Sequence, residues 1–377
     1  MKKQLIIIGN GLATMQLLKE LDHQSDYQVT VLSGEEGFGK SRILSEFEKK
    51  LNSLHLPFKR IRTPIKQAPY ETALQLAKYI AQESGNSSLH TTIEIFSKTT
   101  QKVETNLRYR LFDESASALR SLLEERPQII LIDDIHLCHE SSYDFFIYLQ
   151  NIAMERLKLP LFFFISSDSP NHRFSHVHSI ALTELSRNEI ASVLKQLTPH
   201  QDNLDLIADK VLLETEGIPL FLNSFIKQML KENILKKQAD GYTWLKSPAL
   251  IYEQNFDIPH SIRHLVQQKL AKHSSEELEL LQLLSISGRP LQLEAFLQIL
   301  GWNENKLFDI IERLLSDKVL IVQRKDLEEY FDISRRKYSE VLYENLPSDT
   351  RISLHSLLPQ YLVELNSLPS LNIDQQI

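Results

Sequence analysis

The chain has 377 residues, 42% of them hydrophobic and 24% charged, a composition typical of a folded, water-soluble protein with room for two or three domains. Its formal net charge of −7 argues against a surface that coats nucleic acid, and its single cysteine, Cys138, excludes an internal disulfide and fits a reducing cytoplasm. No apolar run is long enough to cross a bilayer, and the stretch of residues 5–8 is too short for the core of a signal peptide.

The chain begins with an apolar stretch, residues 5–8, that is followed by closely spaced glycines. Residues 5–14 have the sequence LIIIGNGLAT, which is close to the G-x-G-x-x-[GA] turn of dinucleotide-binding folds. Glu35 and Glu36 come after the next strand-like run, roughly where such folds place a ribose-binding acid. Thr14, however, replaces the third small residue, and both glutamates belong to another glycine-rich motif. A flavin- or NAD-dependent oxidoreductase is therefore a remote alternative.

A second glycine-rich loop follows the alternating apolar run Val29–Leu32, which predicts a strand. The loop, Gly34–Ser41, has the sequence GEEGFGKS and completes the pattern G-x-x-x-x-G-K-[ST]. In such loops successive backbone N–H groups point at phosphate oxygens, the lysine reaches the β- and γ-phosphates, and the serine hydroxyl binds Mg²⁺. The helical spacing of residues 42–50 predicts a helix whose N-terminus points at the phosphates. The candidate phosphate-binding residues are Gly34, Glu35, Glu36, Gly37, Phe38, Gly39, Lys40, Ser41 and Arg42.

An acidic strand end should accompany such a loop, because a magnesium nucleotide needs a carboxylate near the metal. Residues 129–134 have the sequence IILIDD, whose four consecutive branched apolar residues predict a parallel strand that is covered on both faces. Its two acids lie at the carboxyl end, where open α/β sheets bind ligands. We expect Ser41 and Asp133 to hold Mg²⁺. Asp134 would polarise the attacking water, and Lys40 is the second candidate catalytic residue.

A third buried strand is predicted at Leu161–Ile165, where the sequence is LFFFI, after the helical pattern of residues 141–156. Such a strand would normally end in a polar residue that contacts the γ-phosphate. Ser166, Ser167 and Asp168 are available for this role, and the arginine often found there is absent.

Beyond about residue 185 the pattern becomes mostly helical, with two short strand-like runs at Val319–Gln323 and Glu329–Ile333. Three helices followed by this pair suggest a winged-helix unit. The expected fold class is α/β, a three-layer P-loop NTPase sandwich with a parallel sheet, followed by a helical subdomain and a winged-helix domain. The expected parts are an ATPase core at 1–183, a helical lid subdomain at 184–235, a linker or hairpin at 236–257, a winged-helix domain at 258–346, and a C-terminal helix and tail at 347–377.

These motifs resemble the STAND class of signal-transduction ATPases, and more narrowly the Orc1-like AAA ATPase domains of large bacterial regulators. The resemblance rests on GEEGFGKSRIL, IILIDDIHL, LTELS and TEGIPLFL, which follow one another in that order. It extends from about Ile6 to about Tyr361. The loop alone is common to all P-loop NTPases. Its combination with the paired aspartates and the G-x-P of residues 217–219 limits the resemblance to the STAND and Orc1-like group.

The resemblance implies further site residues. A glycine-led motif before the first strand would lie near the adenine, which assigns Gly9 and Asn10 to this position, although the family's usual arginine is replaced by Asn10. The G-x-P proline, Pro219, would pack near the base, and the winged-helix domain would clamp the nucleotide. The implied cofactors are ATP and Mg²⁺. Leu137 also departs from the family, which often has tryptophan there.

We therefore predict a cytoplasmic regulatory switch that binds Mg-ATP and couples slow hydrolysis to domain rearrangement. A nucleotide-binding scaffold without hydrolysis, acting through protein contacts, is the alternative that the missing arginine favours. The expected partners are ATP and a protein partner or missing effector domain, and nucleotide-dependent oligomerisation is compatible with either hypothesis. No membrane partner is expected. Two basic groups, Lys236–Lys237 and Arg335–Lys337, could touch DNA, but a solvated charged face is favoured because the family's winged helix acts as an internal clamp.

Two other groups of residues carry weaker indications. His172, His176 and His178 could form a zinc site, but no cysteine lies nearby, so an exposed loop is favoured. Cys138 follows the IILIDD strand closely and is better explained as a small packed side chain than as a nucleophile.

Overall fold

The computed structural model describes residues 29–64, 68–98, 105–153, 159–168, 173–202, 204–325 and 328–365. The chain divides into two compact units, Met1–Tyr252 and Glu253–Ile377. The N-terminal glycine-rich segment, with Gly9, Asn10 and Thr14, lies outside the described residues.

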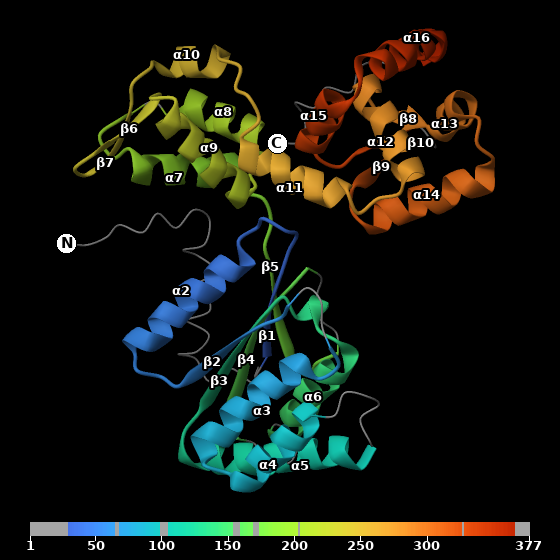
Figure 1. Cartoon of the computed structure of the whole chain (residues 1–377). Helices are drawn as coiled ribbons and strands as arrows, with labels where there is room; N and C mark the ends of the chain where they lie inside the picture. The colour runs from blue at the N-terminus through green and yellow to red at the C-terminus, as the bar shows by residue number, and fades with distance from the viewer. Residues whose placement is uncertain are drawn as a thin grey trace. The chain divides into compact units, whose positions relative to one another are not determined.

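The first unit is built on a five-stranded parallel sheet (Figure 1). The strands lie in the order β2-β3-β4-β1-β5, so the strand before the glycine-rich loop is a neighbour of β4 and is separated from β3 by β4. Their bounds are β1 Val29–Ser33, β2 Phe58–Arg62, β3 Gln128–Asp133, β4 Leu161–Ser167 and β5 Val177–Ala181.

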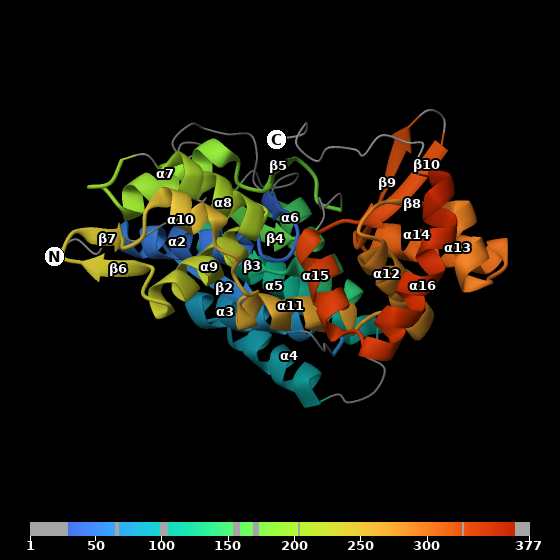
Figure 2. The ribbon, with the colours of Figure 1, turned by 90° about the horizontal axis from the view of Figure 1, so that it is seen from above.

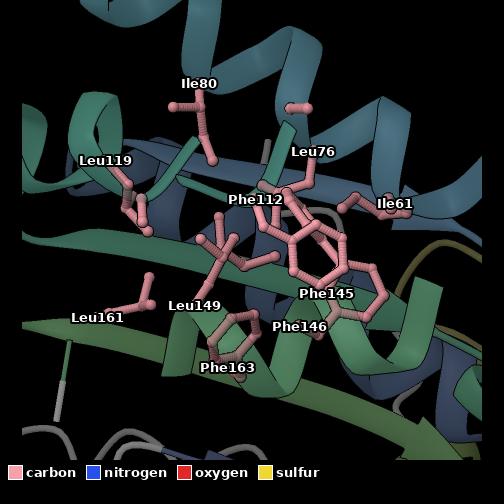
Figure 3. Close-up of a cluster of buried hydrophobic side chains, with 14 of the residues drawn as sticks. Ile61, Leu76, Ile80, Phe112, Leu119, Phe145, Phe146, Leu149, Leu161 and Phe163 are labelled. Atoms are coloured by element: carbon pink, nitrogen blue, oxygen red, sulfur yellow. The ribbon is translucent and has the colours of Figure 1, made fainter. Parts of the chain in front are cut away.

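Alternation along the strands sends their apolar side chains to two opposite layers. In β3, Ile130 and Ile132 belong to one core, whereas Ile129 and Leu131 belong to the other. The first core, part of which is shown in Figure 3, packs the sheet against α3 Glu71–Ser84, α4 Ser87–Lys98, α5 Thr105–Glu125 and α6 Glu140–Asn151. The second core packs the sheet against α2 Lys40–Ser53. This double coverage explains why β1, β3 and β4 are almost continuously apolar in sequence.

The three-layer α/β sandwich with a parallel sheet confirms the predicted fold class, although two strands were missed. β2 has the sequence FKRIR, in which only Ile61 is fully buried, so its charged residues conceal the strand pattern. β5 includes His178, where the sequence favoured an exposed loop. The expectation of a loop was therefore wrong for Val177 and His178, which belong to a strand that pairs in parallel with β1.

A small helical group and a hairpin complete the first unit. The bounds are α7 Arg187–Leu197, α8 Asp205–Thr215, α9 Pro219–Lys231, β6 Leu235–Gln238, β7 Gly241–Trp244 and α10 Pro248–Glu253. Ser186 and Glu189 form a reciprocal capping box that fixes the start of α7. The antiparallel hairpin β6–β7 occupies part of the polar stretch in which the sequence suggested a linker or a hairpin.

The second unit combines helices with a three-stranded antiparallel sheet of order β8-β10-β9. In Figures 1 and 2 this sheet lies beside α12, α13 and α14, in agreement with the contacts between these elements. The winged-helix assignment of this unit stays a prediction. No helix in the described ranges is both long and apolar enough to span a membrane. The bounds are α11 His260–Leu270, α12 Ser275–Ser287, β8 Leu291–Gln292, α13 Leu293–Leu300, α14 Glu304–Ser316, β9 Leu320–Lys325, β10 Glu328–Ile333, α15 Arg336–Asn345 and α16 Ser348–Leu365.

Candidate nucleotide-binding site

The loop between β1 and α2 turns sharply at its glycines. Gly37 has a φ of 94° and Gly39 a φ of 90°, left-handed values that glycine adopts without steric cost. Helix α2 begins directly after Gly39, which provides no side-chain cap for the first turn. A helix N-terminus of this kind presents backbone N–H groups and the positive end of the helix dipole, and this combination binds phosphate groups. The loop and helix therefore have the arrangement that the motif predicts.

Lys40 is nearly buried, with 7% of its side chain exposed. Its Nζ donates to the backbone oxygens of Gly34 and Glu35 and to Asp168 Oδ1, the last at 2.6 Å. An ammonium group has three N–H donors, so these three contacts use all of them. Two of the acceptors are loop carbonyls, which hold the ammonium beside the loop. A phosphate oxygen that approaches Lys40 must therefore compete with Asp168.

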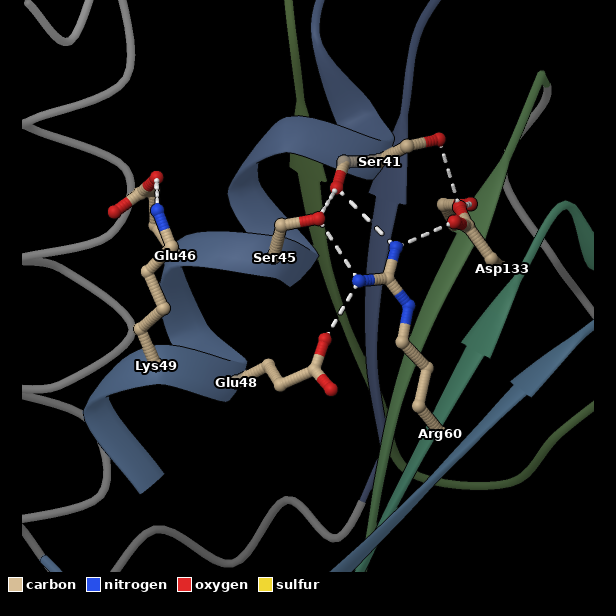
Figure 4. A network of polar contacts seen from close by, with 8 residues as sticks. Ser41, Ser45, Glu46, Glu48, Lys49, Arg60 and Asp133 are labelled. Carbon is tan, nitrogen blue, oxygen red and sulfur yellow. Dashed lines mark hydrogen bonds and ion pairs between the residues drawn. The ribbon is translucent and has the colours of Figure 1, made fainter. Parts of the chain in front are cut away.

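The carboxylate of Asp133 joins the start of α2 to the ends of two neighbouring strands. Its Oδ1 accepts from Ser41 Oγ at 2.9 Å and from Ser166 Oγ at 2.8 Å. Its Oδ2 accepts from Arg60 Nη2 at 2.7 Å (Figure 4). The side chain of Asp133 is 8% exposed, so these donors replace most of the water that a carboxylate would otherwise bind.

Ser41 and Asp133 together fit a magnesium ion that is shared with phosphate groups. Both offer hard oxygen ligands, and the hydroxyl and carboxylate oxygens lie 2.9 Å apart. Mg²⁺ typically keeps several waters and is held by one or two carboxylates plus substrate phosphates. Within the described part of the chain, no group of three or more His, Cys, Asp and Glu side chains could hold a metal ion.

Asp134 follows β3 in a left-handed backbone conformation with a φ of 57°. This turn presents its backbone N–H to Ser166 Oγ at 2.7 Å, and the same hydroxyl lies 3.5 Å from Asp134 Oδ1. Burial, followed by the negative charge of Asp133, raises the pKa of the Asp134 carboxyl. A carboxylate with a raised pKa is a better proton acceptor, which suits the orientation of an attacking water.

Asp168, which directly follows β4, lies between the ammonium of Lys40 and the imidazole of His136. Its Oδ1 pairs with Lys40, and its Oδ2 lies 3.0 Å from His136 Nε2. Burial would raise the pKa of Asp168, but hydrogen bonds from His136 and Lys40 outweigh it and hold the pKa well below the usual range. Asp168 is therefore a stable anion that occupies one donor of the lysine ammonium.

Asp168→Asn should tighten the binding of ATP by about fivefold, because the variant no longer presents an anion that competes with phosphate for Lys40. The factor corresponds to the ~1 kcal/mol typical of a partly exposed ion pair. The side chain of Asp168 is 49% exposed, so a larger effect is not expected. Titration of a fluorescent ATP analogue measures the change.

Asp202→Asn is the matched control for this variant. Asp202 pairs with Lys195 at 2.7 Å in the same unit and is 89% exposed, and its replacement should leave the affinity for ATP unchanged. A weaker affinity in Asp168→Asn than in the wild-type protein would contradict the competition, because Asp168 would then contribute to binding.

The G-x-P segment lies against the glycine-rich loop. The backbone N–H of Leu220 donates to the oxygen of Gly37 at 3.1 Å, and a Cβ on Gly37 would lie 3.2 Å from Ile218 Cγ2. Gly217 has a φ of 69°, and a Cβ there would lie 2.4 Å from the backbone oxygen of Leu185. Pro219 is buried at the first position of α9, where its fixed φ favours the helix. The first turn of α9 is thus joined directly to the loop.

The other predicted nucleotide-binding residues differ in how far they are exposed to solvent. Phe38 is buried, whereas Glu36 and Arg42 are exposed, and Arg42 forms an ion pair with Glu46 at 2.9 Å. The roles of Pro219, Gly9 and Asn10 near the base stay predictions, and the last two lie outside the described residues.

Arg60 is a site residue that the sequence analysis missed. It lies on β2, a strand that was itself missed, and no motif marks it. The only indication in the sequence is a basic residue next to the apolar Ile61 in a short segment before a series of helices.

Cys138 and the histidine group contribute no chemistry to this cluster. Burial raises the pKa of the Cys138 thiol to about 11, which keeps it protonated at neutral pH. His178 belongs to β5 and His176 to the turn before it, whereas His172 lies outside the described residues.

Residues 23–172 match a family model described as an AAA domain. This match assigns residues 23–172 to an AAA domain. The match includes the loop, the paired aspartates and β4, and it confirms the resemblance to AAA ATPases for this part of the chain. It also includes Glu35 and Glu36, the residues that a dinucleotide-binding fold would need as ribose ligands. An AAA domain is a P-loop ATPase fold that binds nucleotide.

Several solved structures are similar to this chain at low sequence identity. A STAND protein with a tetratricopeptide repeat sensor from Pyrococcus horikoshii is 16% identical with a TM-score of 0.42, over 94% of this chain. The chain spans 45% of the length of that protein. Cdc6p from Pyrobaculum aerophilum is 14% identical with a TM-score of 0.39, over 90% of this chain and 95% of its own. Domain III of the Thermotoga maritima replication initiation protein DnaA is 14% identical with a TM-score of 0.37, over 67% of this chain and 93% of its own. The search of curated proteins found no match.

Proposed function

We propose that the protein is an ATP-binding regulatory switch with slow hydrolysis. The observation that carries the proposal is the cluster at the N-terminus of α2, where Lys40, Ser41 and Asp133 lie together at the carboxyl ends of the strands. The ammonium and the N-terminal amides of α2 would bind the phosphates of the nucleotide. Bound Mg²⁺ would neutralise charge on the phosphates, with Ser41 and Asp133 as its protein ligands.

In this proposal Asp134 orients the attacking water and accepts its proton. The raised pKa of Asp134 and its position beside Asp133 support the assignment. Because the protein performs little covalent chemistry in phosphoryl transfer, catalysis would consist mainly of positioning and charge stabilisation. The end of β4 offers Ser166, Ser167 and the anionic Asp168 in place of an arginine, which supports slow turnover.

The contact between the loop and α9 supports the idea of a switch. Gly37 accepts a hydrogen bond from Leu220, and both the loop and the first turn of α9 are tightly packed there. A change in the phosphate-binding loop would therefore act directly on the start of α9. We propose that nucleotide exchange or hydrolysis changes the packing of the helical group α7–α9, as in hinge-type transitions. In this proposal the change in packing alters the contact of the protein with a protein partner or with further copies of itself.

A scaffold that binds nucleotide without hydrolysis is the second candidate. The observation that favours it is the ion pair of Lys40 with Asp168 at 2.6 Å, which places a negative charge near the expected position of the phosphates. Phosphate release by the wild-type protein and by Asp134→Asn distinguishes a slow ATPase from this scaffold.

The proposed function is tested by identifying the nucleotide that the protein retains. The protein is purified without added nucleotide and denatured, and the soluble fraction is separated by ion-exchange chromatography. We expect ATP or ADP in an amount comparable to that of the protein, and saturable ATP binding by calorimetry after the nucleotide is removed. If no nucleotide is retained and the stripped protein does not bind ATP, the proposal is wrong.

A further inference from the structure

Arg60 occupies an unusual position for an arginine, since its side chain is only 9% exposed next to a candidate metal ligand. It lies on β2, whose register places Arg60 opposite Leu131 and Arg62 opposite Asp133 of β3. The side chain therefore reaches along the sheet to the carboxyl end of the neighbouring strand. A guanidinium group stays charged in proteins, so its burial requires anionic partners.

The guanidinium of Arg60 connects β3 to α2 (Figure 4). Nη2 donates to Asp133 Oδ2 at 2.7 Å and to the backbone oxygen of Ser41 at 3.4 Å. Nη1 donates to Glu48 Oε2 and Ser45 Oγ, each at 2.8 Å. Although burial opposes the charged form, hydrogen bonds to Glu48 and Asp133 raise the pKa of Arg60. Arg60 is thus fixed between the first three turns of α2 and the carboxylate of Asp133.

The contact divides the two oxygens of Asp133 between different partners. Oδ2 is taken by Arg60, whereas Oδ1 is shared by the hydroxyl groups of Ser41 and Ser166. The plane of the carboxylate is thereby fixed with Oδ1 directed at Ser41. The negative charge of Asp133 is therefore paired with the guanidinium of Arg60. In a P-loop NTPase without such an arginine, bound Mg²⁺ would provide the positive charge at this place.

We propose that Arg60 is the internal counter-ion and positioning residue of Asp133, and that it makes nucleotide binding largely independent of Mg²⁺. An unpaired carboxylate near the phosphates repels them, and Mg²⁺ ordinarily offsets this repulsion. With Arg60 in place, the charge of Asp133 is partly compensated by a guanidinium that it shares with the 33% exposed Glu48. This inference rests on the proposed nucleotide site and concerns its metal dependence.

The test compares the dissociation constant for ADP in excess EDTA with that in Mg²⁺, using calorimetry. For the wild-type protein we expect the two constants to differ by less than about tenfold. For Arg60→Gln we expect the ratio to rise by at least about tenfold, mainly through weaker binding in EDTA, because Asp133 then lacks its counter-charge. Lys49→Gln is the control: it removes a positive charge from a 57% exposed position on α2 that pairs with Glu46, and it should leave the ratio unchanged.

A double variant separates the counter-ion role from a merely structural one. Arg60→Gln combined with Asp133→Asn removes both charges, so binding in EDTA should return to within about threefold of the wild-type value. A structural role predicts that the double variant binds as weakly as the single variant or more weakly. The double variant also keeps the test decisive if Arg60→Gln alone does not fold, because Asp133→Asn removes the buried carboxylate that Arg60→Gln would leave without its cation, while Glu48 is 33% exposed to water.

The outcomes distinguish this inference from the proposed function. If the wild-type protein binds no nucleotide under either condition, the proposed function fails. If the wild-type protein binds only with Mg²⁺, or if Arg60→Gln folds and keeps the wild-type ratio, Arg60 is not the counter-ion and the inference fails while the nucleotide site stands.

Discussion

Replacing Lys40 with alanine should weaken ATP binding by roughly 100-fold, the effect of losing one strong contact between a charged donor and an anion. The ammonium is 7% exposed and is held by two carbonyl oxygens of the loop, so little of its contribution is lost to solvent or to side-chain motion. Calorimetry with ATP measures the change.

Lys49→Ala is the control for this variant because it removes a lysine from the same helix. Lys49 is 57% exposed and pairs with Glu46 at 2.8 Å, away from the loop. Its replacement should change neither ATP affinity nor the melting temperature by much, since such surface pairs contribute little. Equal ATP affinity in Lys40→Ala and wild-type protein would remove the basis of the proposed site.

The parts of the site that could be predicted are those with a strict local pattern. The spacing of Gly34, Gly39, Lys40 and Ser41 is fixed by the geometry of a phosphate-binding loop, so it is visible in any sequence that has one. The strand that ends in Asp133 was recognisable because its burial on both faces demands an uninterrupted apolar run. The structure brings the glycine-rich loop and Asp133 together because β1 and β3 are parallel strands of one sheet, with β4 between them, and their carboxyl ends lie at the same edge.

The parts that could not be predicted depend on contacts between distant segments. Arg60 contributes through a strand in which three of five residues are charged, and such a strand has no clear alternation. The ion pair of Lys40 with Asp168 joins residues 128 positions apart, and only the parallel pairing of β1 with β4 brings them together. The sequence identified Asp168 as a candidate for phosphate contact but gave no indication that it would pair with the loop lysine.

Replacing Asp134 with asparagine should lower the rate of phosphate release by roughly 100-fold or more, the effect of losing a general base. The substitution changes little else. Asparagine tolerates the left-handed backbone that Asp134 adopts at a φ of 57°, and it keeps the backbone N–H that donates to Ser166 Oγ. ATP affinity should therefore stay within about threefold of the wild-type value, because Asp134 is not among the hydrogen-bond partners described for the side chains of Lys40 and Ser41. Single-turnover phosphate release and ATP titration measure the two quantities.

The combination of the two measurements decides between the switch and the scaffold. A slow wild-type rate that falls in Asp134→Asn, with affinity retained, assigns the hydrolytic step to this carboxylate and makes the hydrolysis rate the timer of the switch. A wild-type rate that is no higher than that of the variant favours the scaffold, in which the charge of Asp134 is unused. Loss of ATP affinity in the variant would contradict both, since it would mean that Asp134 supports the phosphate-binding cluster itself and does not act only on the water.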